Sequence, residues 1–143
     1  MGGMRAENFR QLPEAECRAL LGTAEIGRVG VSVGALPAIF PVRFTVVDDH
    51  VVFRTAQETL MANVVANAIV AFEADAIDHQ RGHGWSVLVV GLAQPIDDHA
   101  DLERVRNVPL APWRSSDDSF VRISTDRISG RMLEPSEITG PDG

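Results

Sequence analysis

The chain has 143 residues, of which 45% are hydrophobic and 23% are charged, a composition typical of one globular domain with an apolar core. Its formal net charge is -7, and no run of lysine or arginine residues is present to follow a phosphate backbone, which argues against nucleic acid as a partner. Gly, Pro or a charged residue interrupts every apolar stretch before it reaches the length of a membrane span, so we expect no membrane contact.

The single cysteine, Cys17, excludes an internal disulfide, and no pair of Cys or His residues has the spacing of zinc ligands. The N-terminal residues lack the apolar core of a signal peptide. We therefore predict a cytoplasmic protein without a metal. The domain is expected to span residues 1–134, and the Gly- and Pro-containing residues 135–143 are expected to form a flexible tail.

The periodicity of apolar residues predicts the secondary structure. Spacings of three and four residues indicate short helices, whereas alternation indicates strands. On these patterns we expect, in chain order, a helix over 13–21, strands over 26–33, 38–47 and 51–55, a helix over 58–67, a strand over 69–75, a loop over 76–84, a strand over 85–93, a helix over 97–106, a loop over 108–113, and strands over 120–125 and 128–132. The apolar run over 87–90 predicts burial on both faces of its strand.

Six or seven strands with two or three short helices predict a mainly β protein of the α+β type, a β-barrel with helical decoration. A doubly wound parallel sheet would need a helix between nearly every pair of strands. The first three expected strands are instead joined by short turns, which favours antiparallel pairing.

The central hairpin brings two arginines together if its turn is Asp48-Asp49. That register keeps one face apolar, with Phe44 opposite Phe53, and it places Arg43 opposite Arg54. Two like charges across a strand pair are unfavourable by up to about 1 kcal/mol unless an anion lies between them. Thr55 and the start of the expected helix at 58 add a hydroxyl and free N–H groups. The pattern therefore predicts a phosphate site, with solvated arginines on a polar sheet face as the alternative.

The order of these segments resembles a known family. A short helix is followed by FPVRF, a hairpin, FRTA, a helix starting near ETLM, the strand VAFEAD, a loop, GWSVLVVG, and the late FVRI and ISGR. Over residues 12–132 this order is similar to that of the pyridoxamine 5'-phosphate oxidase-like proteins, which have an FMN-binding split β-barrel.

The resemblance implies a homodimer that holds FMN in two clefts between the subunits, with a small-molecule substrate. It places Val42, Arg43 and Phe44 along the flavin ring and ribityl chain, and Arg54 and Thr55 near the phosphate. Another cofactor-facing strand holds Trp85, Ser86 and Val87, and the helix start holds Thr59 and Leu60. The alternative for Trp85 is a core or interface aromatic.

The sequence departs from the family near the expected phosphate. Many relatives carry a lysine or arginine in the segment that here reads Glu58-Thr59-Leu60. The resemblance therefore leaves FMN, a deazaflavin coenzyme, heme or no cofactor open. The leading hypothesis is an FMN-dependent oxidoreductase with no catalytic side chain of its own, because the cofactor carries the chemistry. The alternatives are a non-catalytic carrier of a flavin, deazaflavin or heme, and a barrel-fold interaction module with an empty cleft.

The other side chains that could take part in catalysis or metal binding are interpreted as ordinary structural or solvated residues. The four histidines occupy expected turns or polar segments, which is typical of solvated residues: His50, His79, His83 and His99. Cys17 lies on the apolar face of the first expected helix and is interpreted as a small core residue. Nothing resembles a P-loop or the GxSxG nucleophile motif.

Overall fold

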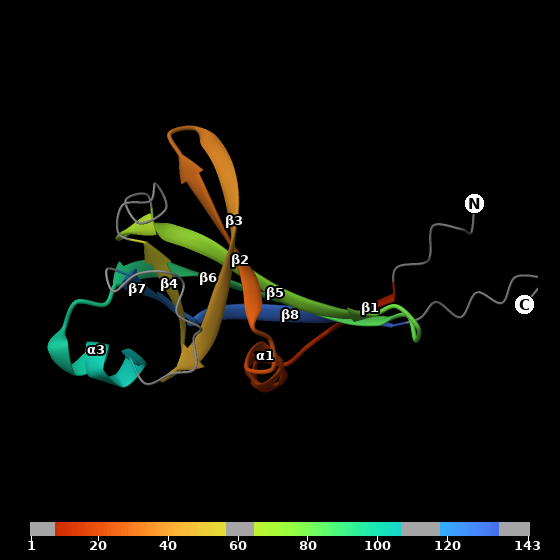
Figure 1. The fold of residues 1–143 in the computed structure, drawn as a ribbon. Helices are drawn as coiled ribbons and strands as arrows, with labels where there is room; N and C mark the ends of the chain where they lie inside the picture. The colour runs from red at the N-terminus through yellow and green to blue at the C-terminus, as the bar shows by residue number, and fades with distance from the viewer. Residues whose placement is uncertain (1–7, 57–64, 107–117, 135–143) are drawn as a thin grey trace, which may run out of the picture.

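The structure is a computed structural model and describes residues 8–56, 65–106 and 118–134. Its elements (Figure 1) are, in chain order, β1 (Asn8–Gln11), α1 (Glu14–Leu21), β2 (Ile26–Val33), β3 (Leu36–Val47), β4 (His50–Ala56), β5 (Ile69–Asp78), β6 (His83–Pro95), α3 (His99–Arg106), β7 (Asp118–Ser124) and β8 (Arg127–Glu134).

All strand pairs are antiparallel, and six strands close into a barrel. The sheet order is β1-β8-β6-β5-β2-β3-β4-β7, and β6 pairs with β7 as well, which joins the two ends of β6-β5-β2-β3-β4-β7. The strands β8 and β1 extend the sheet beyond β6 (Figure 1). The predicted mainly β barrel with short helices is confirmed, with six barrel strands and two additional ones among the described residues.

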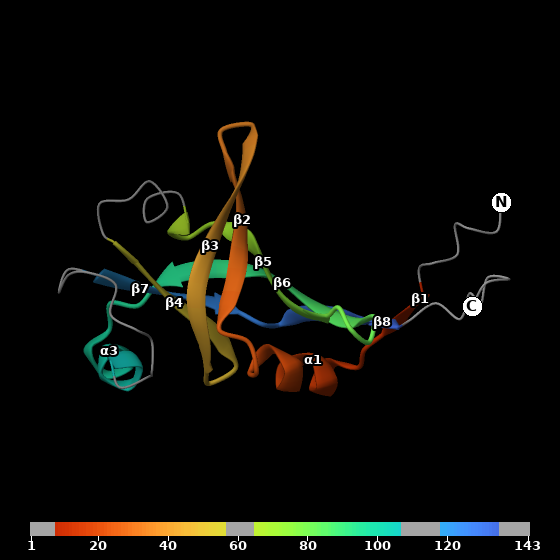
Figure 2. The ribbon, with the colours of Figure 1, turned by 45° about the vertical axis from the view of Figure 1, so that its right-hand side comes forward.

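The barrel is split because single long strands change partners along their length. In β3, the residues up to Arg43 pair with β2, and those from Phe44 onward pair with β4. In β6, pairing with β7 begins at Ala93, just after Gly91. A Cβ atom at Gly91 would collide with the main-chain carbonyl of Ser124, so only glycine permits this close approach. The β2–β3 hairpin projects from the barrel (Figure 2).

The interior is filled by the alternate, inward-facing side chains of the strands. Phe44 packs edge-on against Phe72 with ring centroids 4.8 Å apart, and α1 adds the buried Cys17 and Leu21. A second apolar cluster lies between α3 and the sheet and contains Val52, Ile96, Val105 and Phe120. The predicted role of Cys17 as a small core residue is confirmed.

The Asp48-Asp49 turn has the predicted register, with Val46 opposite Val51. Both aspartates have positive φ, 49° and 61°, which a two-residue hairpin turn of the type I′ class requires. Thr125 joins this turn to α1, because its hydroxyl donates to the Asp49 carbonyl and accepts from the Arg18 guanidinium.

Several expectations need correction. The run over 87–90 is not buried on both faces: Val87 and Val89 are fully buried, but Leu88 is 40% exposed because its side of β6 carries no covering layer. The expected loop over 76–84 is shorter, since β5 continues to Asp78 and β6 begins at His83. The strand β1 was not predicted, since four residues show too little alternation. The expected helix over 58–67 and loop over 108–113 lie largely or wholly outside the described residues, as does the tail.

Candidate functional site

The two arginines of the expected phosphate site adjoin the buried pair Phe44–Phe53, so by strand alternation both leave the β3–β4 hairpin on the side away from the core. The ladder between β3 and β4 ends at the Phe44–Phe53 pair, one step before the arginines. Arg43 pairs instead with Ile26 of β2, and Arg54 pairs with Phe120 of β7. The predicted cross-strand arginine pair is therefore not part of the ladder, because β3 changes partner between Arg43 and Phe44.

Arg54 lies against an aromatic ring. Its guanidinium carbon is 5.0 Å from the ring centroid of Phe120, within cation–π range. Thr55 is 8% exposed and, by strand alternation, leaves β4 on the opposite side from Arg54. The ring of Phe120 thus orients Arg54, whereas the side chain of Thr55 lies on the barrel side of β4.

The other residues that were expected to contact the cofactor lie on both sides of their strands. Val42 and Phe44 are 7% and 3% exposed and face the core, as does the fully buried Val87, whose strand is paired on both sides. Trp85 is half-buried against the core cluster, as the core interpretation predicts. Ser86 points to the other side. Thr59 and Leu60 lie outside the described residues.

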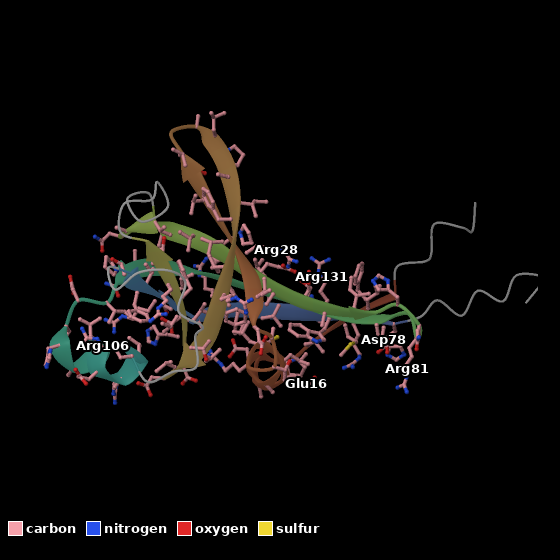
Figure 3. The ribbon with its side chains drawn as sticks, in the orientation of Figure 1. Glu16, Arg28, Asp78, Arg81, Arg106 and Arg131 are labelled. Atoms are coloured by element: carbon pink, nitrogen blue, oxygen red, sulfur yellow. The ribbon has the colours of Figure 1, made fainter. Side chains whose placement is uncertain are left out.

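We use "outer face" for the side of β1, β2, β3, β5, β6 and β8 that points away from α1 and the core. The strand registers align its residues in rows across the sheet. Its charged residues are Arg28, Arg43, Glu73, Asp75, Arg127 and Arg131. Figure 3 shows two of them, Arg28 and Arg131, on the side of the sheet opposite α1.

A polar network on the outer face centres on Glu73. The Arg28 guanidinium donates to Glu73 Oε1 at 2.8 Å and lies 3.3 Å from Asp75 Oδ1. The Ser86 hydroxyl donates to Glu73 Oε2 at 3.0 Å. Burial raises the pKa of Glu73 above its ordinary value, and a hydrogen bond with Asp75 raises it further, against the opposing effects of Arg28 and Ser86. Sequence reasoning selected only Ser86, because finding its partners requires the register of three strands.

A hollow of about 750 Å³ lies where β1, β5, β6 and β8 meet, a volume within the range of small-molecule sites. Glu73, Ser86 and Arg131 contribute polar groups to it. Its lining also includes Phe9, Gln11, Leu12, Leu88, Ile128, Ser129 and Gly130. We refer to it as the β1–β8 hollow.

Two further properties concern metals and membranes. No group of three or more His, Cys, Asp or Glu side chains within the described ranges is placed to hold a metal ion. Over the same ranges, neither helix has the length and apolar character needed to cross a membrane.

The chain is similar to several known proteins. Residues 13–132 match the family described as pyridoxamine 5'-phosphate oxidase. An uncharacterised protein of Mycobacterium tuberculosis is 36% identical over 140 residues, which cover 94% of this chain and 86% of the relative. The solved FAD-binding protein of Mycobacterium smegmatis is 35% identical with a TM-score of 0.78, covering 87% of this chain and 97% of that one.

A structure from Corynebacterium glutamicum, provisionally assigned as a pyridoxamine 5'-phosphate oxidase, is 31% identical with a TM-score of 0.77. The match covers 90% of this chain and 96% of the other. The fold, the family match and these identities agree with the segment order found in the sequence. The chain belongs to the pyridoxamine 5'-phosphate oxidase-like family of split β-barrels.

Proposed function

We propose that this protein is a flavin-dependent oxidoreductase that binds FMN with its phosphate near Arg54 and Arg43. Strand alternation supports the proposal, because Arg43 and Arg54 adjoin the buried pair Phe44–Phe53 and so leave the hairpin on its opposite side, and the guanidinium of Arg54 lies against the ring of Phe120. Guanidinium groups match the geometry and charge of a phosphate, so these residues fit the anionic end of a flavin nucleotide. A relative 35% identical to this chain is an FAD-binding protein, which makes FAD the closest alternative.

In this proposal the bound flavin supplies the hydride or electron transfer, and the protein supplies binding and orientation. Arg43 and Arg54 hold the anionic end. The strand β3 lies beside the ring at Val42, Arg43 and Phe44, and Ser86 offers a hydroxyl from the outer face. No side chain of this chain is assigned as catalytic.

The same proposal includes a homodimer. Large apolar side chains are exposed on the outer face, among them Ile39 at 72%, Ile69 at 67% and Leu88 at 40%. A second copy that covers them would bury this apolar area and enclose a cofactor that otherwise has only one wall. We also assign the protein to the cytoplasm, where its buried free thiol at Cys17 would stay reduced.

The visible absorption spectrum of the purified full-length protein tests the cofactor assignment, and chromatography of the released cofactor separates FMN from FAD. We expect Arg54→Ala to weaken flavin binding at least about tenfold, because a charge-assisted hydrogen bond is worth about 1.5–3 kcal/mol. Arg43→Ala should weaken it less, since Arg43 is exposed and, among the described residues, contacts no aromatic ring.

Arg104→Ala is the matched control, because Arg104 of α3 is an exposed arginine that pairs with Asp48 in the β3–β4 turn, at the opposite end of β4 from Arg54. Unchanged affinity in Arg54→Ala and Arg43→Ala would contradict the phosphate assignment.

A carrier without turnover is the second candidate, and the acidic and apolar residues Glu58 and Leu60 in the expected phosphate segment favour it. Anaerobic reduction of the bound flavin by a nicotinamide donor, followed by reoxidation by an acceptor, supports the oxidoreductase. Tight binding with no reduction by any donor tested supports the carrier.

A further inference from the structure

A pocket of about 160 Å³ lies between α3 and the strands β4 and β7, at the far end of the molecule from β1 (Figure 1). We refer to it as the α3 pocket. It shares no residue with the β1–β8 hollow. No described residue that is proposed to hold the flavin, or to be covered by a second copy of the chain, lines it. The pocket is therefore distinct from the proposed cofactor and subunit contacts.

The α3 pocket has an apolar floor and a charged rim. The floor is formed by Val52, Ile96 and Val105, which belong to the second apolar cluster and are buried. The rim includes the exposed pair Arg104 and Asp48, which marks the side that is open to solvent. A cavity of about 150 Å³ is large enough to bind benzene, so the α3 pocket suits a molecule with one small ring.

The charged side chains of the α3 pocket are paired with one another. Arg104 Nη1 is 2.8 Å from Asp48 Oδ2, and Arg122 Nη1 is 3.1 Å from Asp101 Oδ2. The Nδ1 of His50 donates to the Asp48 carbonyl at 2.9 Å. An acid in this pocket would lie beside two carboxylates, and a base beside two guanidinium groups, so a buried charge of either sign would be poorly paired. The pocket therefore favours an uncharged ligand.

Arg122 and Asp101 each keep a hydrogen-bonding group that such a ligand could use. The Arg122 Nε–H is buried and has no hydrogen-bond partner in the part of the chain that the structure describes, which is unfavourable until an acceptor is supplied. Asp101 accepts from Arg122 Nη1 through Oδ2, and its Oδ1 accepts no hydrogen bond from another described residue. The two side chains thus place a donor edge next to an acceptor oxygen. A carboxamide is complementary to this pair, because its carbonyl accepts and its NH₂ group donates.

We propose that the α3 pocket binds a small uncharged aromatic carboxamide, with its ring against Val52, Ile96 and Val105 and its amide group between Arg122 and Asp101. The carbonyl accepts from the Nε and Nη2 edge of the Arg122 guanidinium, and the NH₂ group donates to Asp101 Oδ1. Binding at this site does not depend on a flavin being present.

An NMR titration of the full-length ¹⁵N-labelled protein, as purified, tests the site with three probes that share one ring: benzamide, benzoate and toluene. We expect benzamide to bind saturably and at least about tenfold more tightly than either of the others. Benzoate tests the preference for an uncharged ligand, and toluene tests the need for the amide. Tighter binding of benzoate, equal binding of toluene, or no binding of benzamide would overturn the proposal.

The matched pair of variants is Arg122→Met and Arg106→Met. Arg106 is an exposed arginine of α3 that pairs with Glu103 and does not line the pocket. Arg122→Met should lose at least about tenfold in benzamide affinity, whereas Arg106→Met should stay within about twofold. Equal losses for both variants would show that Arg122 is not a ligand of benzamide.

A third variant keeps the polar groups and changes only the space. Val105→Ile adds one methylene group to the floor of the pocket and should weaken benzamide binding at least about threefold, with the thermal unfolding midpoint close to that of the parent. Unchanged affinity in this variant would place the ring elsewhere, whatever the effect of Arg122→Met on folding.

Two further measurements locate the bound amide. In the parent protein, benzamide should shift the Nε–H NMR signal of Arg122 and leave that of Arg106 unchanged, and the reverse pattern would contradict the site. The affinity for benzamide should also be the same, within about twofold, before and after the protein is saturated with FMN. Competition between benzamide and FMN would place benzamide in the flavin site, and the proposal would fail.

Discussion

The two sides of the same strands have different chemistry. On the inner side of β5 and β6, Val70, Phe72, Val87 and Val89 are 0–2% exposed. On the outer face of these strands, Leu88 and Ile69 are 40% and 67% exposed and stand beside the charged network of Glu73. Since successive side chains of a strand point to opposite sides, one stretch of sequence supports both surfaces. The inner side holds the barrel together, and the outer face is free to contact other molecules.

The first prediction compares one large residue from each side. Phe72→Ala should lower the free energy of unfolding by about 3–5 kcal/mol, because it removes a fully buried ring that contacts Phe44. Leu88→Ala should cost about 1 kcal/mol or less in the free energy of unfolding of the monomer. Urea denaturation monitored by tryptophan fluorescence measures both.

The same two variants bear on the proposed homodimer. Leu88→Ala should weaken self-association in sedimentation experiments, because a second copy would cover this side chain. Phe72→Ala does not alter the outer face directly. If Leu88→Ala lowered the free energy of unfolding as much as Phe72→Ala at every protein concentration, the distinction between the two sides would be contradicted.

The second prediction concerns two glycines of the sheet. Gly91→Ala should cost about 1–3 kcal/mol of unfolding free energy, because its Cβ would collide with the Ser124 carbonyl where β6 crosses to β7. Gly30→Ala is the control: its Cβ would lie 3.7 Å from that of Ala71, an ordinary contact on the outer face. That variant should be neutral or slightly stabilising. Similar changes in unfolding free energy for Gly91→Ala and Gly30→Ala would mean that β6 can accommodate a Cβ atom at position 91, against the close contact seen in the structure.

Most of the barrel is predictable from local patterns. The helix at Glu14–Leu21, the strand Ile26–Val33 and the register around Asp48-Asp49 follow from apolar periodicity and turn chemistry, which act over a few residues. The exposure of Leu88 does not follow from local patterns. An apolar run has the same sequence whether the outer side of its strand is covered by the same chain or left exposed.

The candidate sites are less predictable because they depend on partners distant in sequence. The point at which β3 leaves β4 for β2 determines the strand neighbours of Arg43, and no local pattern near Arg43 marks it. The Glu73 network needs β2, β5 and β6 in register, and the β1–β8 hollow needs the unpredicted strand β1. Sequence reasoning therefore selected chemically competent residues and could not assemble the network or the hollow.

The smallest expected effect concerns the titration of Glu73. Its folded-state pKa is raised, first by burial and then by the hydrogen bond with Asp75, so the folded protein takes up a proton at a higher pH than the unfolded chain. This group therefore makes the protein less stable as the pH rises from the ordinary pKa of a glutamate through the raised one.

NMR titration of the Glu73 side-chain carboxyl measures the pKa directly. Asp75→Asn should move it down, because it removes the negative charge of Asp75, which raises the pKa of Glu73. Ser86→Ala, which removes a hydrogen bond that lowers the pKa, should move it up. A shift in the same direction for both variants would contradict the opposite contributions assigned to Asp75 and Ser86.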